Sequence, residues 1–131
     1  MERRALQLAI LLGGCVPVYA GASGAWRGAA FMGPWPGPGG ADSHFRYLSG
    51  LLLAIGLILW GCVPTIEARG TIVRTLTAVV VTGGLARLLG WLTVGDPGPT
   101  RWALIMELVV TPLLCLWQAR IARQSGRLRA S

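Results

Sequence analysis

Four apolar stretches constrain this chain more than any other feature of its sequence. They lie at about residues 5–24, 45–63, 72–94 and 102–119. A membrane-spanning helix needs about 20 mostly apolar residues to cross roughly 30 Å of hydrocarbon, and each stretch meets that requirement. Only 13% of the residues are charged, whereas a soluble domain usually carries about 25%. We therefore predict an all-α integral membrane protein with four spans.

The connections between the stretches predict how the spans follow one another. Residues 25–44 include a Gly/Pro-rich run that disfavours both helix and strand, so we expect an irregular loop there. The connections at 64–70 and 95–101 are short enough to make consecutive helices antiparallel neighbours. The sequence thus predicts one domain, residues 1–131, folded as an up-down-up-down four-helix bundle.

Arginines near the span ends predict the orientation, because positive charge favours the cytoplasmic side. Eight arginines fall on one side and three on the other; the three are Arg27, Arg46 and Arg101. Both termini are then cytoplasmic, and residues 120–131 form a basic cytoplasmic tail. The chain has no lysine or asparagine and is rich in Ala, Gly and Pro, as is typical of GC-rich bacterial genomes. We expect a multi-pass protein of the bacterial inner membrane.

Composition also argues against several classes of protein. The formal charge of +7 does not indicate a nucleic-acid partner, since the arginines flank apolar runs instead of forming one basic face. A single histidine excludes a bis-histidine haem site within one chain, and the absence of lysine excludes a Schiff base. The three cysteines lie inside apolar segments without a Cys-x-x-Cys pair, which disfavours a disulfide or zinc site. No cofactor and no metal are predicted.

The first stretch has a second interpretation. A basic start followed by a short apolar core is also the pattern of a secretion signal, and residues 12–15 resemble a lipoprotein cleavage site. The apolar character continues to Ala22, which is long for a signal core. We therefore expect an uncleaved first helix.

Arg87 is the most unusual residue in the predicted spans. It lies about seven residues, or roughly 10 Å, inside the predicted outer end of the third span. An unpartnered charge at that depth costs at least about 2.5 kcal/mol. Glu107 is the only acid inside a span and lies at similar depth in the fourth, so we predict an ion pair between the two. The pair either marks a functional site or only fixes how the two helices meet.

Four other residues on the predicted outer side complete the candidate ligand-binding pocket: Trp91, Thr111, His44 and Arg46. Trp91 and Thr111 each lie one helical turn from a member of the ion pair. Histidine is the side chain type that commonly changes charge near neutral pH, so His44 is a candidate for proton transfer or ligand binding. In a helix His44 and Arg46 point to nearly opposite faces, so both enter one pocket only if His44 belongs to the loop. Otherwise His44 is an interfacial side chain.

Three motifs stand at these positions: Ser-His-Phe-Arg-Tyr-Leu-Ser-Gly at residues 43–50, Gly-Gly-Leu-Ala-Arg at 83–87 and Glu-Leu-Val-Val-Thr-Pro at 107–112. Together they resemble a bacterial family of small four-helix membrane proteins, domain-of-unknown-function family 4345. The resemblance covers nearly the whole chain and implies its fold and topology. It places the family's His, Arg, Arg and Glu positions on His44, Arg46, Arg87 and Glu107. It implies no established activity.

Two classes of function fit these residues. In the first, the pocket binds a small amphipathic molecule such as a lipid, an isoprenoid or a quinone; arginine binds an anionic or carbonyl group, and Glu107 or His44 moves a proton. In the second, the protein is an accessory or assembly subunit of a larger membrane protein complex. Transport is disfavoured, because small four-helix exporters rely on a glutamate in the first span, where this chain has only Gln7. The residues leave open whether the protein is an enzyme.

Overall fold

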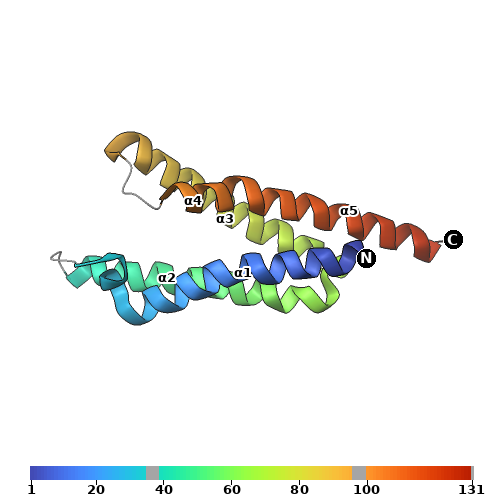
Figure 1. The fold of residues 1–131 in the computed structure, drawn as a ribbon, viewed down its shortest axis with the longest axis horizontal. Coiled ribbons are helices and arrows are strands. Elements are labelled where there is room, and N and C mark those ends of the chain that lie inside the picture. The colour runs from blue at the N-terminus through green and yellow to red at the C-terminus, as the bar shows by residue number, and fades with distance from the viewer. Residues whose placement is uncertain (35–38, 96–99, 131) are drawn as a thin grey trace. The chain divides into compact units, whose positions relative to one another are not determined.

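The computed structural model describes residues 1–34, 39–95 and 100–130, and every element in these ranges is helical (Figure 1). The elements are α1 (Glu2–Arg27), η1 (Gly28–Met32), α2 (Gly39–Cys62), η2 (Val63–Ala68), α3 (Gly70–Val94), α4 (Thr100–Ile105), η3 (Met106–Val110) and α5 (Thr111–Ala130). Of these, η1 and η2 are 3₁₀ helices and η3 is a π-helix.

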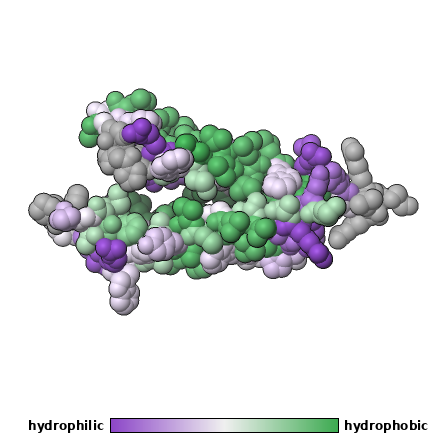
Figure 2. Space-filling model, viewed as in Figure 1, coloured by the Kyte–Doolittle hydropathy of each residue, from purple (hydrophilic) through white to green (hydrophobic). Residues whose placement is uncertain are grey.

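Four helical stretches within the described residues are long and apolar enough to cross a membrane: Glu2–Met32, Gly39–Ala68, Gly70–Val94 and Arg101–Gly126. Hydrophobic residues cover the middle of the helices, and hydrophilic residues gather toward the ends (Figure 2). Many large apolar side chains are exposed, such as Leu92 and Leu116, as a surface that faces lipid requires. These findings confirm the predicted all-α fold with four spans and indicate a multi-pass membrane protein. The orientation of the spans stays a prediction.

The predicted loop at residues 25–44 is wrong in extent. Helix α1 continues to Arg27 and is followed by η1, while α2 already begins at Gly39. Of the Gly/Pro-rich run itself, residues 35–38 lie outside the described residues, as do 96–99 of the third connection. The helices are longer than predicted because side chains on α2 bind backbone groups at the end of α1 and in η1, where apolar patterning gives no signal.

The contacts of the chain form two units. The first, called the α3–α5 unit, contains Met1–Gln7 and Pro64–Ser131; the second, called the α1–α2 unit, contains Leu8–Val63. That residues 1–131 form a single domain stays a prediction.

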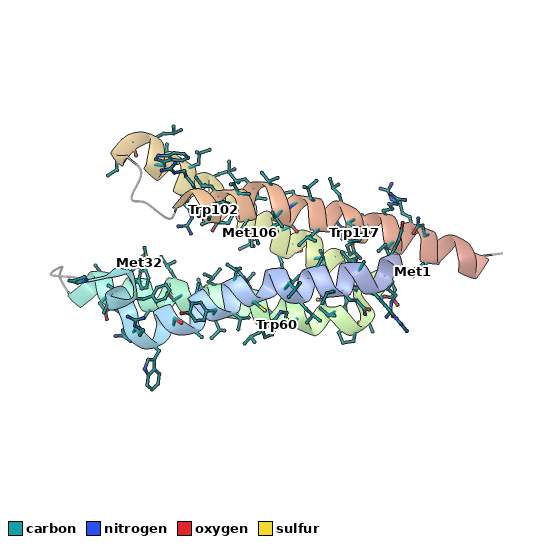
Figure 3. The ribbon with its side chains drawn as sticks, viewed as in Figure 1. Met1, Met32, Trp60, Trp102, Met106 and Trp117 are labelled. Carbon is teal, nitrogen blue, oxygen red and sulfur yellow. The ribbon has the colours of Figure 1, made fainter. Side chains whose placement is uncertain are left out.

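In the α1–α2 unit the two helices run antiparallel, with glycines where their backbones come closest. A Cβ atom on Gly21 would lie 2.7 Å from the Cα of Leu53, and one on Gly56 would lie 3.1 Å from the backbone nitrogen of Val18. Small residues at such crossings are typical of helix pairs in membranes. The indole Nε1 of Trp60, which is labelled in Figure 3, also donates to the carbonyl of Leu11 at 3.0 Å.

In the α3–α5 unit, α3 packs antiparallel against the fourth span, which is built from α4, η3 and α5. The start of α1 joins this unit, because Arg3 donates to the carboxylate of Glu67 at 3.0 Å and to the carbonyl of Pro64 at 2.8 Å. Gln118 of α5 is fully buried and donates its side-chain amide to the carbonyl of Ile66 at 2.7 Å. These contacts fix η2 and α5 at one end of the unit.

Candidate functional site

The fourth span is interrupted where it carries Glu107. Residues Met106–Val110 form a single π-helical turn, wider than an α-helical one, between α4 and α5. Pro112 gives a reason for the widened turn, since proline has no amide hydrogen and its ring clashes with the carbonyl four residues earlier. The hydroxyl of Thr111 donates to the carbonyl of Met106 at 2.8 Å, five residues back. Such π-helical turns are rare and frequently lie at functional sites.

The predicted ion pair between Arg87 and Glu107 is present. Nε of Arg87 lies 3.0 Å from Oε2 of Glu107, and Nη2 lies 3.1 Å from Oε1, so the carboxylate accepts two parallel hydrogen bonds. This bidentate geometry is among the strongest that an arginine and a carboxylate form. It joins α3 to the π-helical turn.

Gly84 allows the two helices to approach closely enough for this pair. A Cβ atom on Gly84 would lie 2.9 Å from the Cβ of Glu107 and 2.8 Å from Cδ2 of Leu108, closer than real Cβ atoms come to their neighbours. The adjacent Gly83 has no atom within 4 Å of the equivalent position. Gly84 is therefore required by the contact, whereas Gly83 is not.

The guanidinium of Arg87 is only partly used by its partner. Its side chain is 44% exposed, against 19% for Glu107. Two of the five N–H donors of an arginine serve Glu107, and the other three have no hydrogen-bond partner among the described residues. Inside a membrane no water satisfies such donors, so an acceptor from outside the pair would stabilise them.

Two further candidate residues flank the pair on the same unit. Thr111 directly follows the π-helical turn at the start of α5. Its hydroxyl hydrogen already binds the carbonyl of Met106, so Thr111 supports the backbone that carries Glu107. Trp91 is half-buried one turn along α3 from Arg87. Figure 3 shows Met106 and Trp102 on the part of the fourth span that includes the turn.

Arg46 lies on α2 in the other unit and binds groups of its own hairpin. Its Nε lies 2.7 Å from Oδ2 of Asp42, and its Nη1 donates to the carbonyls of Ala25 and Trp26 at 3.0 and 2.6 Å. The other carboxylate oxygen, Oδ1 of Asp42, accepts from the amide of Ala29 at 2.7 Å. Arg46 and Asp42 together satisfy backbone groups at the turn between α1 and η1.

Gly28 makes room for these two side chains. Its backbone has a φ of +63°, a left-handed conformation that glycine adopts without strain, and a Cβ atom there would collide with Asp42 and Arg46. This network is not among the features predicted from the sequence, although the i, i+4 spacing of Asp42 and Arg46 after a glycine is a usable signal. His44, two residues from either, is exposed.

The structure therefore brings Arg87 and Glu107 together, with Thr111 and Trp91 nearby, and places His44 and Arg46 on the α1–α2 unit. The predicted convergence of all six residues in one pocket stays a prediction. A separate cavity of about 220 Å³ lies in the α3–α5 unit, lined by Glu67, Ala68, Ala122, Ser125 and Gly126. No group of three His, Cys, Asp or Glu side chains that could hold a metal ion occurs within the described ranges.

Comparison with known families identifies the chain. The sequence model of a family described as a domain of unknown function, DUF4345, matches residues 5–118. The chain is a member of the DUF4345 family. The DUF4345 match confirms the resemblance seen in the three motifs and includes all six candidate residues. Comparison with curated proteins and with solved structures gives no match.

Proposed function

We propose that this DUF4345 protein binds the polar head of a small amphipathic molecule at the Arg87–Glu107 pair. The observation that supports the proposal is the half-exposed side chain of Arg87. Two of its five N–H groups donate to Glu107, and the other three have no partner among the described residues. Ionisable groups inside a span are costly and commonly mark binding or transfer sites. A ligand oxygen at Arg87 would satisfy donors that lipid tails cannot.

The pairing favours a neutral ligand. The two charges of Arg87 and Glu107 cancel, and an anionic head group would compete with the carboxylate for the same guanidinium in a low-dielectric medium. A neutral carbonyl or hydroxyl oxygen can accept from the remaining donors while the pair stays intact. A quinone, an isoprenoid alcohol or a neutral lipid meets this condition better than a fatty acid.

A competition between two probes with tails of nearly equal length tests the proposal. Purified full-length protein would be equilibrated in mild detergent with decylubiquinone and decanoate, and the retained amounts measured by mass spectrometry. We expect retention of the neutral probe over decanoate, and a loss of at least about tenfold in Arg87→Gln, equivalent to about 1.4 kcal/mol. Arg27→Gln, on the other unit, is the matched control and should retain the probe. Preference for decanoate, or undiminished retention in Arg87→Gln, would contradict the proposal.

A second candidate function is an accessory or assembly subunit of a larger membrane protein complex. One observation favours it: Gly83 and Gly90 of α3 are exposed, with no atom within 4 Å of a Cβ position on either. Exposed small residues allow a neighbouring helix to pack closely in a membrane. A stoichiometric complex that is lost in Gly90→Leu and kept in Arg87→Gln would support this function. A chain that leaves its own membrane without a partner protein would count against it.

We further propose that the protein resides in a bacterial inner membrane with both termini cytoplasmic. The support is the distribution of arginines, eight on one side of the predicted spans and three on the other. Reporter fusions test it: a fluorescent protein at either terminus should fold and fluoresce, whereas alkaline phosphatase at either terminus should stay inactive. Active phosphatase at a terminus would overturn the orientation.

A further inference from the structure

One end of the α3–α5 unit gathers half of the chain's twelve arginines. Six arginines whose side chains are exposed lie there, at the start of α1, around the start of α3 and along α5: Arg3, Arg4, Arg69, Arg74, Arg120 and Arg123. We propose that this arginine end binds the headgroups of anionic phospholipids in one leaflet of the membrane.

Carboxylates neutralise only part of this charge. Glu67 accepts from Arg3 at 3.0 Å, and Glu2 lies 3.7 Å from Arg120. The chain has five acidic residues in all, and the other three lie elsewhere in the sequence, at Asp42, Asp96 and Glu107.

The remaining four arginines of this end are Arg4, Arg69, Arg74 and Arg123, and they form no ion pair among the described residues. Two of them are positioned by hydroxyl groups. Nε of Arg69 donates to Oγ1 of Thr65 at 3.2 Å, and Nη2 of Arg74 donates to Oγ1 of Thr71 at 3.3 Å. Each such contact uses a single N–H of a guanidinium that has five. The positive charge and most of the donors remain available for phosphate oxygens, which arginine binds with the same fork geometry as carboxylates.

Fewer arginines lie at the opposite ends of the helices, namely Arg27, Arg46 and Arg101. Arg27 lies over the ring of Phe31, 5.7 Å from its centroid, and Arg46 is held by Asp42 and two backbone carbonyls. The arginine end also borders apolar helix surface long enough to cross a membrane, which places its charges at headgroup depth when the spans are inserted. A charged surface at that depth meets lipid headgroups before any soluble anion.

Lipid selectivity in nanodiscs tests the proposal with the full chain. The protein would be reconstituted in dioleoylphosphatidylcholine containing a minor share of dioleoylphosphatidylglycerol, re-extracted gently, and the retained lipids quantified by mass spectrometry. We expect enrichment of the anionic lipid, and a weakening of about fivefold for each of Arg4, Arg69, Arg74 and Arg123 changed to glutamine. Arg27→Gln is the matched control at the other end and should leave the enrichment unchanged.

Two further measurements keep the test independent of how the glutamine variants insert. Raising the salt concentration from about 0.05 M to 1 M should abolish the enrichment in the unmodified protein, because exposed charges are then screened within about 3 Å. The four-lysine variant at the same positions keeps the charge and should retain the enrichment. Enrichment that survives high salt, or that is lost equally in Arg27→Gln, would overturn the proposal.

Discussion

Arg46 and Arg87 form ion pairs of similar exposure on the two units, yet their surroundings differ. Each arginine side chain is 44% exposed, and each lies within about 3 Å of a carboxylate. Arg46 is paired with a residue four positions away on its own helix, and its Nη1 also serves two backbone carbonyls. Arg87 is paired across two helices, and its remaining donors serve no group among the described residues. The two arginines therefore differ in whether N–H groups outside the ion pair bind backbone carbonyls.

This comparison separates a structural pair from a candidate binding pair. Three N–H groups of Arg46 bind Asp42 and two backbone carbonyls at the turn after α1, so the fold alone explains this arginine. Where three donors have no partner among the described residues of an apolar span, as at Arg87, the fold does not explain the exposure.

The largest effect is expected from breaking the Arg87–Glu107 pair. Glu107→Gln leaves Arg87 without its counter-charge, so the free energy of unfolding in mixed micelles should fall by at least about 2.5 kcal/mol. Asp42→Asn should cost less, because Arg46 keeps two carbonyl acceptors. The double variant Arg87→Met, Glu107→Met should recover most of the stability, since apolar pairs of similar volume commonly replace buried ion pairs. An equal loss in Glu107→Gln and Asp42→Asn would remove the contrast between the two pairs.

The next effect concerns the approach of α3 to the π-helical turn. Gly84→Ala should destabilise the protein by about 1–3 kcal/mol, because the new Cβ would lie 2.9 Å from the Cβ of Glu107. Gly83→Ala is the matched control, and its open surroundings let alanine stabilise the helix by about 0.5–1 kcal/mol. Thermal unfolding in detergent measures both. Changes of the same sign in the two variants would show that Gly84 does not set the helix approach.

A smaller effect is expected from the structural pair. Arg46→Gln removes the donors from the carbonyls of Ala25 and Trp26 and should cost about 1–2 kcal/mol, because the helix end lies where water can partly replace them. Arg27→Gln is the control and should cost less, at most about 0.5–1 kcal/mol, because it removes only the contact of Arg27 with the ring of Phe31. Hydrogen exchange of residues 25–32 should rise more in Arg46→Gln than in Arg27→Gln. Unchanged exchange in that segment would mean that Arg46 does not stabilise the turn.

The smallest effect tests a contact that involves no charge. Trp60→Phe keeps an aromatic ring in α2 but removes the indole donor to the carbonyl of Leu11, and should cost about 0.5–1.5 kcal/mol. Trp117→Phe is the control, since Trp117 forms no hydrogen bond among the described residues. Chemical unfolding in mixed micelles measures the free energy of unfolding of both variants. Equal losses would show that ring size, and not the hydrogen bond to Leu11, causes the effect.

The sequence predicted the fold better than the site. Four apolar stretches correctly predicted four long helices. One charge of each sign at similar depth correctly predicted the Arg87–Glu107 pair, because a lone charge inside a span is costly. The extension of α1 past residue 24 could not be read from hydropathy, since it depends on hydrogen bonds from Asp42 and Arg46 to distant backbone groups. The π-helical turn depends on the local effect of Pro112. The pattern of apolar residues gives no signal for this turn either.

The most direct test of the account is native mass spectrometry of the protein released from its own membrane in mild detergent. The unmodified chain should carry a neutral small-molecule adduct that is reproducible between preparations. The adduct should be absent from the double variant Arg87→Met, Glu107→Met and retained in Gly83→Ala. An adduct of equal abundance on the double variant, or an unmodified chain that carries none, would contradict the claim that the Arg87–Glu107 pair is a binding site.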